Sequence, residues 1–169
     1  ELQRIAIEES RLGIPLLIGR DVIHGFRTIF PIPLAQACSW NPELIKQGAR
    51  IAACEAAKVG INWTFAPMID ISRDPRWGRT QECYGEDPFL SGTLGVQFVK
   101  GLQGNHPRYL KTVATPKHFA VYNQETNRFS NNAIVPIRIL REYYLPAFEA
   151  CIVEGKAAAI MTSYNAVNG

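Results

Sequence analysis

The sequence predicts an α/β fold in which parallel strands alternate with helices. Four continuous apolar runs, each short enough for a strand, lie at residues 15–19, 62–69, 112–119 and 157–164. Such runs are typical of parallel strands that are covered on both faces. Segments with helical spacing of apolar residues lie before and between them, and strict alternation of helix and strand predicts a parallel sheet with helices outside.

Sequence signals at the helix starts support this interpretation. An Asn-Pro pair and an Asp-Pro pair mark the beginnings of helices expected over 41–60 and 87–101. A polar capping residue followed by proline at the first helical position is a typical helix start. A third helix is expected over 137–153, and the first ten residues also have helical spacing.

The strand expected at 112–119 contains a proline at position 116. Proline has no N–H to donate to a strand ladder, so Pro116 is expected at a strand end or a bulge. Together the segments predict roughly four parallel strands that alternate with helices.

Composition excludes several classes of protein. The chain has 169 residues, about one domain's length, and 47% of them are hydrophobic. A net charge of +3 is too mild to indicate a nucleic-acid partner, which usually meets a clustered basic face. The sequence holds no apolar stretch of the ~18 residues that a membrane helix needs, so no membrane partner is expected.

No motif predicts a cofactor or a metal. The sequence has no phosphate-binding loop, no dinucleotide fingerprint and no serine-hydrolase motif. The three histidines lack metal-ligand spacing. No two cysteines form a C-x-x-C pair, and all four are expected to be small buried thiols: Cys38, Cys54, Cys83 and Cys151.

Polar side chains follow each of the four predicted strands. Residues 21–27 include Asp21, His24 and Arg27, residues 70–79 follow the second strand, Lys117 and His118 end the third, and residues 163–165 end the fourth. Ligands of parallel α/β sheets bind beyond the carboxyl ends of the strands. Four strands that place polar groups on one rim predict a ligand site there.

The loop after the second strand, Arg-Asp-Pro-Arg-Trp-Gly-Arg, is stiff, cationic and aromatic, and it suits a polar, ring-shaped ligand. One of its arginines, Arg76 or Arg79, is expected to hold the loop by pairing with Asp70 or Asp74. Trp77 is expected to pack the loop, although it could also stack on a sugar.

Asp21 and the Lys117–His118 pair are the sharpest candidates for contacts with hydroxyls. A carboxylate can accept two hydrogen bonds from vicinal hydroxyls, but Asp21 could instead cap the next segment or pair with Arg20 or Arg27. Neighbours on a regular strand point to opposite faces, so Lys117 and His118 reach one ligand only if the backbone is irregular there. The alternative leaves Lys117 solvated and His118 buried. His24 is expected to be a structural hydrogen bonder.

The acidic residues do not nominate a catalytic pair. Ion pairing or helix capping explains most of Glu82, Glu86, Asp87 and Glu125, and Glu125 is expected to pair with Arg128. Hydrolysis of a glycoside needs two carboxyl groups about 5–9 Å apart, and spacing along the chain cannot show this.

Taken together, the motifs resemble glycoside hydrolase family 3, and within it the β-glucosidase branch. The resemblance covers the whole chain and rests on residues 19–34 (GRDVIHGFRTIFPIPL), 66–79 (APMIDISRDPRWGR), 85–88 (GEDP), 117–119 (KHF) and 161–169 (MTSYNAVNG).

This resemblance implies a (β/α)8-like barrel domain followed by an α/β sandwich domain, and retaining hydrolysis of terminal β-linked glucosyl residues without a cofactor. The implied partner is a β-glucoside or oligosaccharide, and a periplasmic or secreted location is left open. The implied contacts to the terminal sugar are Asp21, Arg79, Lys117 and His118, with Arg27 bracing them and Met161 and Tyr164 near the anomeric carbon.

The resemblance also implies that both catalytic carboxyl groups lie outside this chain. The family's nucleophile is an aspartate about thirty residues beyond a tyrosine like Tyr164, after Gly169, and the acid/base lies in the second domain. Residues 1–169 are therefore expected to be a part of the N-terminal barrel domain that does not turn over substrate alone.

Two details bear on the branch. The hexosaminidase type of the family has Pro-Gly-His-Gly after Lys-His-Phe, whereas residues 120–128 here read AVYNQETNR. The xylosidase type usually has glutamate where Asp21 stands, and the shorter aspartate leaves room for a hydroxymethyl group. A glucoside is therefore favoured, with a β-xylosidase, another β-glycosidase of the family, or a non-catalytic sugar-binding fragment as alternatives.

Overall fold

Short parallel strands lie at the centre of the molecule. The computed structural model describes residues 1–169. Strands β1 (Gly19–Arg20), β2 (Trp63–Thr64) and β3 (Val113–Ala114) form a parallel sheet in that order. Strand β4 (Lys117–Phe119) pairs in parallel with β6 (Met161–Thr162). The prediction of an α/β structure with parallel strands is confirmed.

Backbone contacts connect the two sheets. Met68 forms a parallel bridge with Lys117, and the N–H of Ile69 donates to the Lys117 carbonyl at 3.0 Å. On the other side, the N–H of Ala159 donates to the Ala114 carbonyl at 3.3 Å. The segments that carry β1, β2, β3–β4 and β6 therefore lie side by side in the order of the chain.

The first predicted strand is wrong in its position. Pairing begins only at Gly19, and residues 15–18 are not a strand. The side chain of Asn62 takes the place of a ladder there: it accepts from the Ile18 N–H at 2.7 Å and donates to the Leu16 carbonyl at 3.2 Å. Pro15 has no N–H to offer a neighbouring strand.

The third predicted strand is divided at Pro116, as expected from its missing N–H. The part before Pro116 pairs with β2 and the part after it pairs with β6. The register shifts between Lys117 and Phe119, so the backbone is irregular there, which was the condition for Lys117 and His118 to reach one ligand. Only Met161–Thr162 of the fourth run forms a strand.

Strands β5 (Asn132–Ala133) and β7 (Ala166–Val167) form a further parallel pair that the sequence did not predict. The side chain of Asn168 extends this pairing. It accepts from the Val135 N–H at 2.9 Å and donates to the Val135 carbonyl at 3.0 Å.

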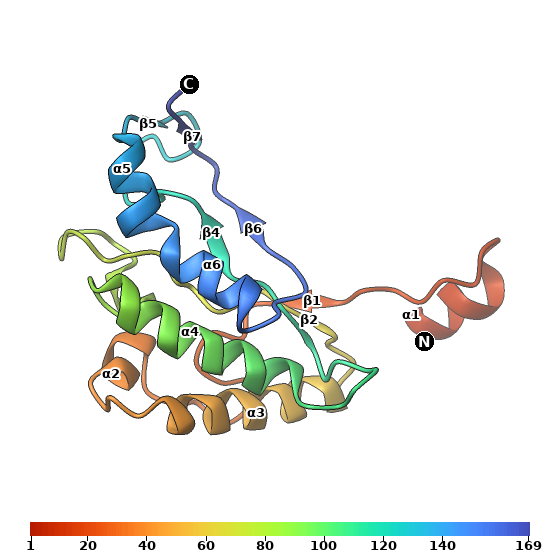
Figure 1. Ribbon diagram of the computed structural model, residues 1–169. Helices are drawn as coiled ribbons and strands as arrows, with labels where there is room; N and C mark the ends of the chain where they lie inside the picture. Colours follow the sequence, from red (N-terminus) through yellow and green to blue (C-terminus); the bar gives the residue numbers. More distant parts are fainter.

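The two helices with clear start signals are confirmed. Helix α3 (Pro42–Lys58) is capped by Asn41 and α4 (Pro88–Gln103) by Asp87, and each cap accepts the backbone N–H three residues further on. Helix α3 packs on α4, and α4 packs on α6 (Figure 1). A Cβ at Gly101 would lie 2.4 Å from the Lys46 carbonyl oxygen, so glycine allows this close approach.

The helix predicted over 137–153 is interrupted. It consists of α5 (Ile137–Ile139), the π-helical turn η3 (Leu140–Tyr144) and α6 (Pro146–Val153). Pro146 cannot donate within a helix, and the wider turn lies directly before it. The remaining short elements are α1 (Leu2–Arg4), the π-helical turn η1 (Ile5–Glu9), α2 (Pro33–Ala37) and the 3₁₀ turn η2 (Thr80–Glu82).

The main core lies between the helices and the sheet. It contains Ile45, Ile69, Leu94, Phe98 and Phe148, all almost fully buried. This packing holds the strands in place from one side and leaves their carboxyl ends free to carry polar groups.

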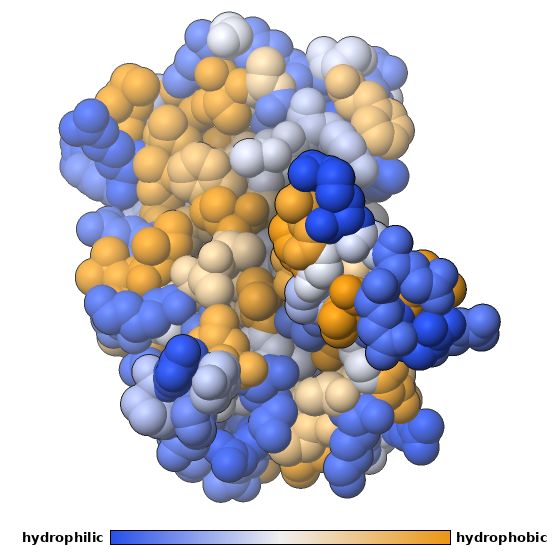
Figure 2. Space-filling model, turned by 90° about the vertical axis from the view of Figure 1, so that its right-hand side faces the viewer, coloured by the Kyte–Doolittle hydropathy of each residue, from blue (hydrophilic) through white to orange (hydrophobic).

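The N-terminal segment extends away from the body of the molecule (Figure 1). Leu2, Ile7, Leu12 and Leu17 of this segment are exposed, and apolar patches lie among polar ones on the face seen in Figure 2. None of the helices combines the length and the apolar character that crossing a membrane requires.

Candidate functional site

A cavity of about 460 Å³ lies at the carboxyl ends of the strands, and we call it the strand-end pocket. Asp21 follows β1, Lys117 and His118 belong to β4, and Met161 belongs to β6. Six of the seven predicted binding residues line the pocket: Asp21, Arg79, Lys117, His118, Met161 and Tyr164.

Arg27 is the seventh, and the structure places it outside the pocket. It is exposed, and its backbone N–H donates to Glu55 of α3 at 2.9 Å, as does the N–H of Thr28. Hydrogen bonds from the Thr28 side chain and from both backbone groups lower the pKa of Glu55. The segment is thus anchored on α3, and a role of Arg27 in bracing the site stays a prediction.

Lys117 and Asp21 form the shortest charged contact of the pocket. The Lys117 Nζ lies 2.6 Å from the Asp21 Oδ1, with 4% of the lysine side chain and 63% of the aspartate side chain exposed. A solvated Lys117 is therefore wrong, and so is a pairing of Asp21 with Arg20 or Arg27. The ammonium group is buried against a carboxylate that itself faces the opening, which leaves that carboxylate accessible to a ligand.

Arg79 is held by Glu82, which the sequence did not single out as its partner. The Arg79 Nε and Nη2 donate to the two Glu82 carboxylate oxygens at 2.7 and 2.9 Å, a bidentate arrangement. These bonds raise the pKa of Arg79. Burial opposes ionisation of Glu82, but the hydrogen bonds from Arg79 and the nearby Arg79, Lys117 and His118 together outweigh it and lower the pKa of this carboxyl. The available signal in the sequence was that Arg79 and Glu82 are three residues apart, across η2.

His118 is bonded to Asp70, which lies at the end of the apolar run after β2. The Asp70 Oδ2 accepts the backbone N–H of His118 at 2.8 Å and lies 3.0 Å from its Nδ1. Both side chains are buried. Burial raises the pKa of Asp70, and the hydrogen bonds from His118 oppose this rise. Asp70 was expected only as a possible partner of an arginine, and the structure gives it a histidine instead.

The loop over 73–79 is held by its own residues, as predicted. Arg76 pairs with Asp74 through bonds of 2.7 to 3.2 Å, which lower the pKa of Asp74 to about 2. Trp77 is buried and its Nε1 donates to Glu125 at 3.1 Å. The prediction that Trp77 packs the loop is confirmed, and only Arg79 of the loop's arginines lines the pocket.

Arg128 is a pocket residue that sequence reasoning placed only in an ion pair. The predicted pair with Glu125 is present at 3.2 Å. Arg128 also lies over the rings of Phe129 and Tyr164, and these two rings are 4.7 Å apart. Tyr164 is thereby positioned at the pocket by a loop from a different part of the chain.

The remaining candidates are structural. The His24 Nδ1 lies 2.8 Å from the Phe30 carbonyl oxygen, so this histidine is a structural hydrogen bonder as expected. All four cysteines are free thiols. Burial raises the pKa of Cys83, and that of Cys151 to about 12, whereas Cys38 is exposed and contradicts the expectation of buried thiols.

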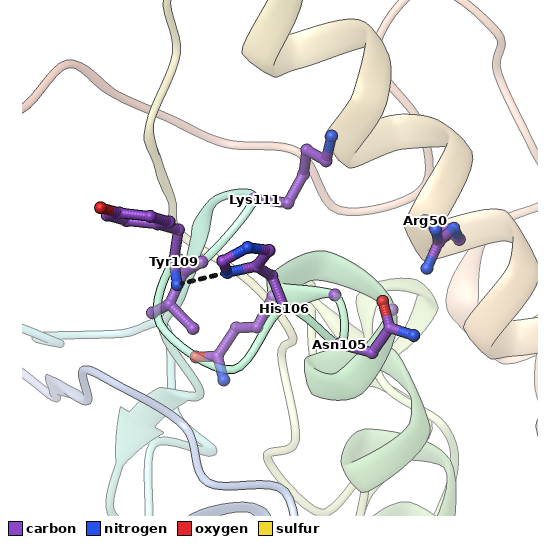
Figure 3. Close-up of a pocket in the computed structure, with 9 residues that line it drawn as sticks. Arg50, Asn105, His106, Tyr109 and Lys111 are labelled. Atoms are coloured by element: carbon purple, nitrogen blue, oxygen red, sulfur yellow. Dashed lines mark hydrogen bonds between the residues drawn. The ribbon is translucent and has the colours of Figure 1, made fainter.

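A second cavity, of about 330 Å³, lies between the C-terminal end of α4, the loop before β3 and α3, and we call it the α3–α4 hollow (Figure 3). Arg50, His106 and Lys111 line it, and all three are exposed. The His106 Nδ1 accepts the Tyr109 N–H at 3.1 Å, while Arg50 and Lys111 take part in no ion pair. The hollow is lined by residues that come before β3 in the chain, whereas the strand-end pocket lies at the carboxyl ends of the strands.

Comparison with known proteins identifies the class. The description "Glycosyl hydrolase family 3 N terminal domain" applies to a family model that matches residues 1–169. This chain therefore belongs to glycoside hydrolase family 3.

Relatives within the family have both glucosidase and xylosidase names. The chain is 41% identical to a periplasmic β-glucosidase of Salmonella typhimurium over 171 residues, which cover all of this chain and 22% of the relative. It is 36% identical to a β-xylosidase of Formosa agariphila over 184 residues, all of this chain and 25% of the relative.

Solved structures show the same architecture. The β-glucosidase from Listeria innocua in complex with glucose matches with a TM-score of 0.90 and 43% identity, over 98% of this chain and 24% of that one. The chain thus spans about a quarter of the length of these relatives.

Proposed function

We propose that the full-length protein is an exo-acting, retaining β-glucosidase and that this chain supplies its pocket for the terminal sugar. The observation that carries the proposal is the Lys117–Asp21 contact of 2.6 Å at the mouth of the strand-end pocket. A buried ammonium group and an accessible carboxylate, fixed side by side, provide a donor and an acceptor for neighbouring hydroxyls.

The other polar groups of the pocket extend this pattern. Arg79 offers donors in a fixed orientation because Glu82 holds its guanidinium on two sides. His118 lies beside it, with its Nε2 3.3 Å from the Arg79 Nη1. A sugar ring presents hydroxyls that both donate and accept, and a cavity of about 460 Å³ is large enough for one such ring.

In this proposal the four parallel segments are part of a (β/α)8 barrel within the N-terminal domain. The other strands, the α/β sandwich domain, the nucleophilic aspartate and the acid/base belong to parts of the protein outside residues 1–169. Met161 and Tyr164 lie next to the anomeric carbon. Retaining hydrolysis needs both carboxyl groups, so residues 1–169 alone bind the sugar without cleaving a glycoside.

The choice of glucose over xylose rests on Asp21. A glutamate at this position would extend one methylene further toward the ligand, and the shorter aspartate leaves space for the hydroxymethyl group of a hexose. The relatives include enzymes with both names, so a β-xylosidase is the second candidate.

The test is hydrolysis of 4-nitrophenyl β-glucoside and β-xyloside by the full-length protein. We expect the higher kcat/KM for the glucoside, and a loss of roughly 100-fold or more in Asp21→Ala, because hydroxyl contacts strengthen in the transition state. A preference for the xyloside would select the second candidate. Binding of glucose without release of nitrophenol would indicate a non-catalytic sugar-binding protein, and normal kinetics in Asp21→Ala would remove Asp21 from the site.

A further inference from the structure

Asp70 lies beneath the strand-end pocket and does not line it. Its side chain is 1% exposed, and its Oδ2 faces both the backbone N–H and the Nδ1 of His118. Strand pairing fixes this contact: Met68 bridges to Lys117, and the Ile69 N–H donates to the Lys117 carbonyl at 3.0 Å. Asp70 is the next residue along and therefore meets His118.

The two sides of the His118 ring face groups of opposite hydrogen-bonding character. The Nδ1 is 3.0 Å from the carboxylate of Asp70, which only accepts when ionised. The Nε2 is 3.3 Å from the Nη1 of Arg79, and a guanidinium only donates. A proton on Nδ1 and a lone pair on Nε2 satisfy both contacts, while the opposite tautomer would place two acceptors together on one side and two donors together on the other.

We propose that Asp70 is a positioning residue that holds His118 in the Nδ1–H tautomer, so that its Nε2 accepts a hydrogen bond from a hydroxyl of the bound sugar. An aspartate that accepts from Nδ1 fixes tautomer and ring orientation in other histidine sites. Tyr122 limits the rotation of the ring from the side, with its centroid 4.8 Å from that of His118. This inference rests on the proposed function for the identity of the ligand.

The arrangement gives the pocket a defined set of partners for one hydroxyl. In the complex a sugar hydroxyl takes the place of Arg79 as the hydrogen-bond donor to the Nε2 of His118, and the Nη1 of Arg79 donates to the oxygen of that hydroxyl. Lys117 and Asp21 offer the same combination, one donor and one acceptor, on the other side. Without Asp70, the Nε2 could carry the proton, and the site would present a second donor in place of the acceptor.

The tautomer is measured by ¹⁵N NMR of the full-length protein with labelled histidine at neutral pH, and His118→Gln assigns the signal. We expect a protonated Nδ1 and an unprotonated Nε2 before any substrate is added. A protonated Nε2 in the wild-type protein overturns the proposal. This readout needs no activity, so it decides the inference even if the full-length protein cleaves no glycoside and the proposed function fails.

Kinetics of paired variants test whether Asp70 acts through His118. Asp70→Leu removes the acceptor and should lower kcat/KM by roughly 10- to 100-fold, as when the orienting partner of a metal-bound histidine is removed. Asp70→Asn keeps an oxygen that can accept both His118 N–H groups and should retain most of the activity. In a His118→Gln background, Asp70→Leu should lower kcat/KM little further, because the effects of mutating two contacting residues are not additive.

If Asp70→Leu lowers kcat/KM equally in the wild-type and His118→Gln backgrounds, Asp70 supports only the fold. An Asp70→Asn variant with kcat/KM as low as that of Asp70→Leu would also contradict the proposal. If Asp70→Leu does not fold, the NMR signal of Asp70→Asn decides, because the proposal requires the Nδ1–H tautomer to persist there. A protonated Nε2 in a folded Asp70→Asn variant with full activity would overturn it.

Discussion

The strand-end pocket and the α3–α4 hollow contain the same types of basic side chain and differ in what surrounds them. The hollow has Arg50, Lys111 and His106, and the pocket has two arginines, Arg79 and Arg128, with Lys117 and His118. In the pocket each of these four side chains contacts a carboxylate, and Lys117 and His118 are buried. In the hollow all three are exposed and none contacts a carboxylate.

This difference teaches that residue type alone does not define a site. Burying a charged group is costly unless it is paired, so a buried lysine with its own carboxylate is held in one geometry. Exposed side chains keep their rotamer freedom and lose it only when a ligand binds, which weakens binding. The pocket is preorganised for a ligand and the hollow is not.

The matched lysines give the largest expected difference between the two cavities. In the full-length protein, Lys117→Met removes a hydrogen bond that involves a charged group, worth about 1.5–3 kcal/mol, and should lower kcat/KM for the aryl glucoside by roughly 10- to 150-fold. Lys111→Met should leave kcat/KM unchanged. Similar losses in both variants would remove the distinction between the cavities.

The matched glutamates should show a smaller difference. Glu82→Gln replaces the charged partner of Arg79 by a neutral one that keeps a single acceptor, and we expect a loss of about 1 kcal/mol, or roughly fivefold in kcat/KM. Glu43 lies beside the α3–α4 hollow and pairs with the half-exposed Lys46 at 3.2 Å. Glu43→Gln is therefore expected to behave as wild type, and a fivefold effect there would count against this account.

The smallest expected effect concerns the same two variants and is a difference in how their stability depends on pH. The pKa of Glu82 is below its ordinary value of 4.5. A carboxyl with a lowered pKa in the folded state stabilises the fold above its unfolded pKa, and this contribution is lost as the pH falls through the folded value. Between pH 7 and pH 3, the Tm of Glu82→Gln should fall less steeply than that of wild type, whereas Glu43→Gln should follow wild type. Parallel curves for all three would contradict the strong pairing with Arg79.

Local signals in the sequence predicted the helices well and the strands less well. The caps at Asn41 and Asp87 satisfy N–H groups within one turn, so they can be recognised from adjacent residues. Pro116 divides its strand for an equally local reason. The run at 15–19 is apolar like a strand, but whether it pairs depends on Asn62, 44 residues away from Ile18.

In the candidate site, too, the sequence predicted what local motifs determine and missed contacts between distant segments. The motifs identified Asp21, Arg79, Lys117 and His118, and the structure brings these side chains to one cavity. The sequence did not predict that Asp70 meets His118, because this contact depends on the register between two strand segments 48 residues apart. Arg27 follows the same strand as Asp21, yet its backbone N–H donates to Glu55 of α3, and Arg27 does not line the pocket.

The most direct test of the central claim is a crystal structure of the full-length protein soaked with glucose. This account predicts one glucose in the strand-end pocket, with its hydroxyls in hydrogen-bond contact with Asp21, Arg79, Lys117 and His118. Glucose bound only elsewhere, for example in the α3–α4 hollow, or a ring that contacts none of these four residues, would contradict it.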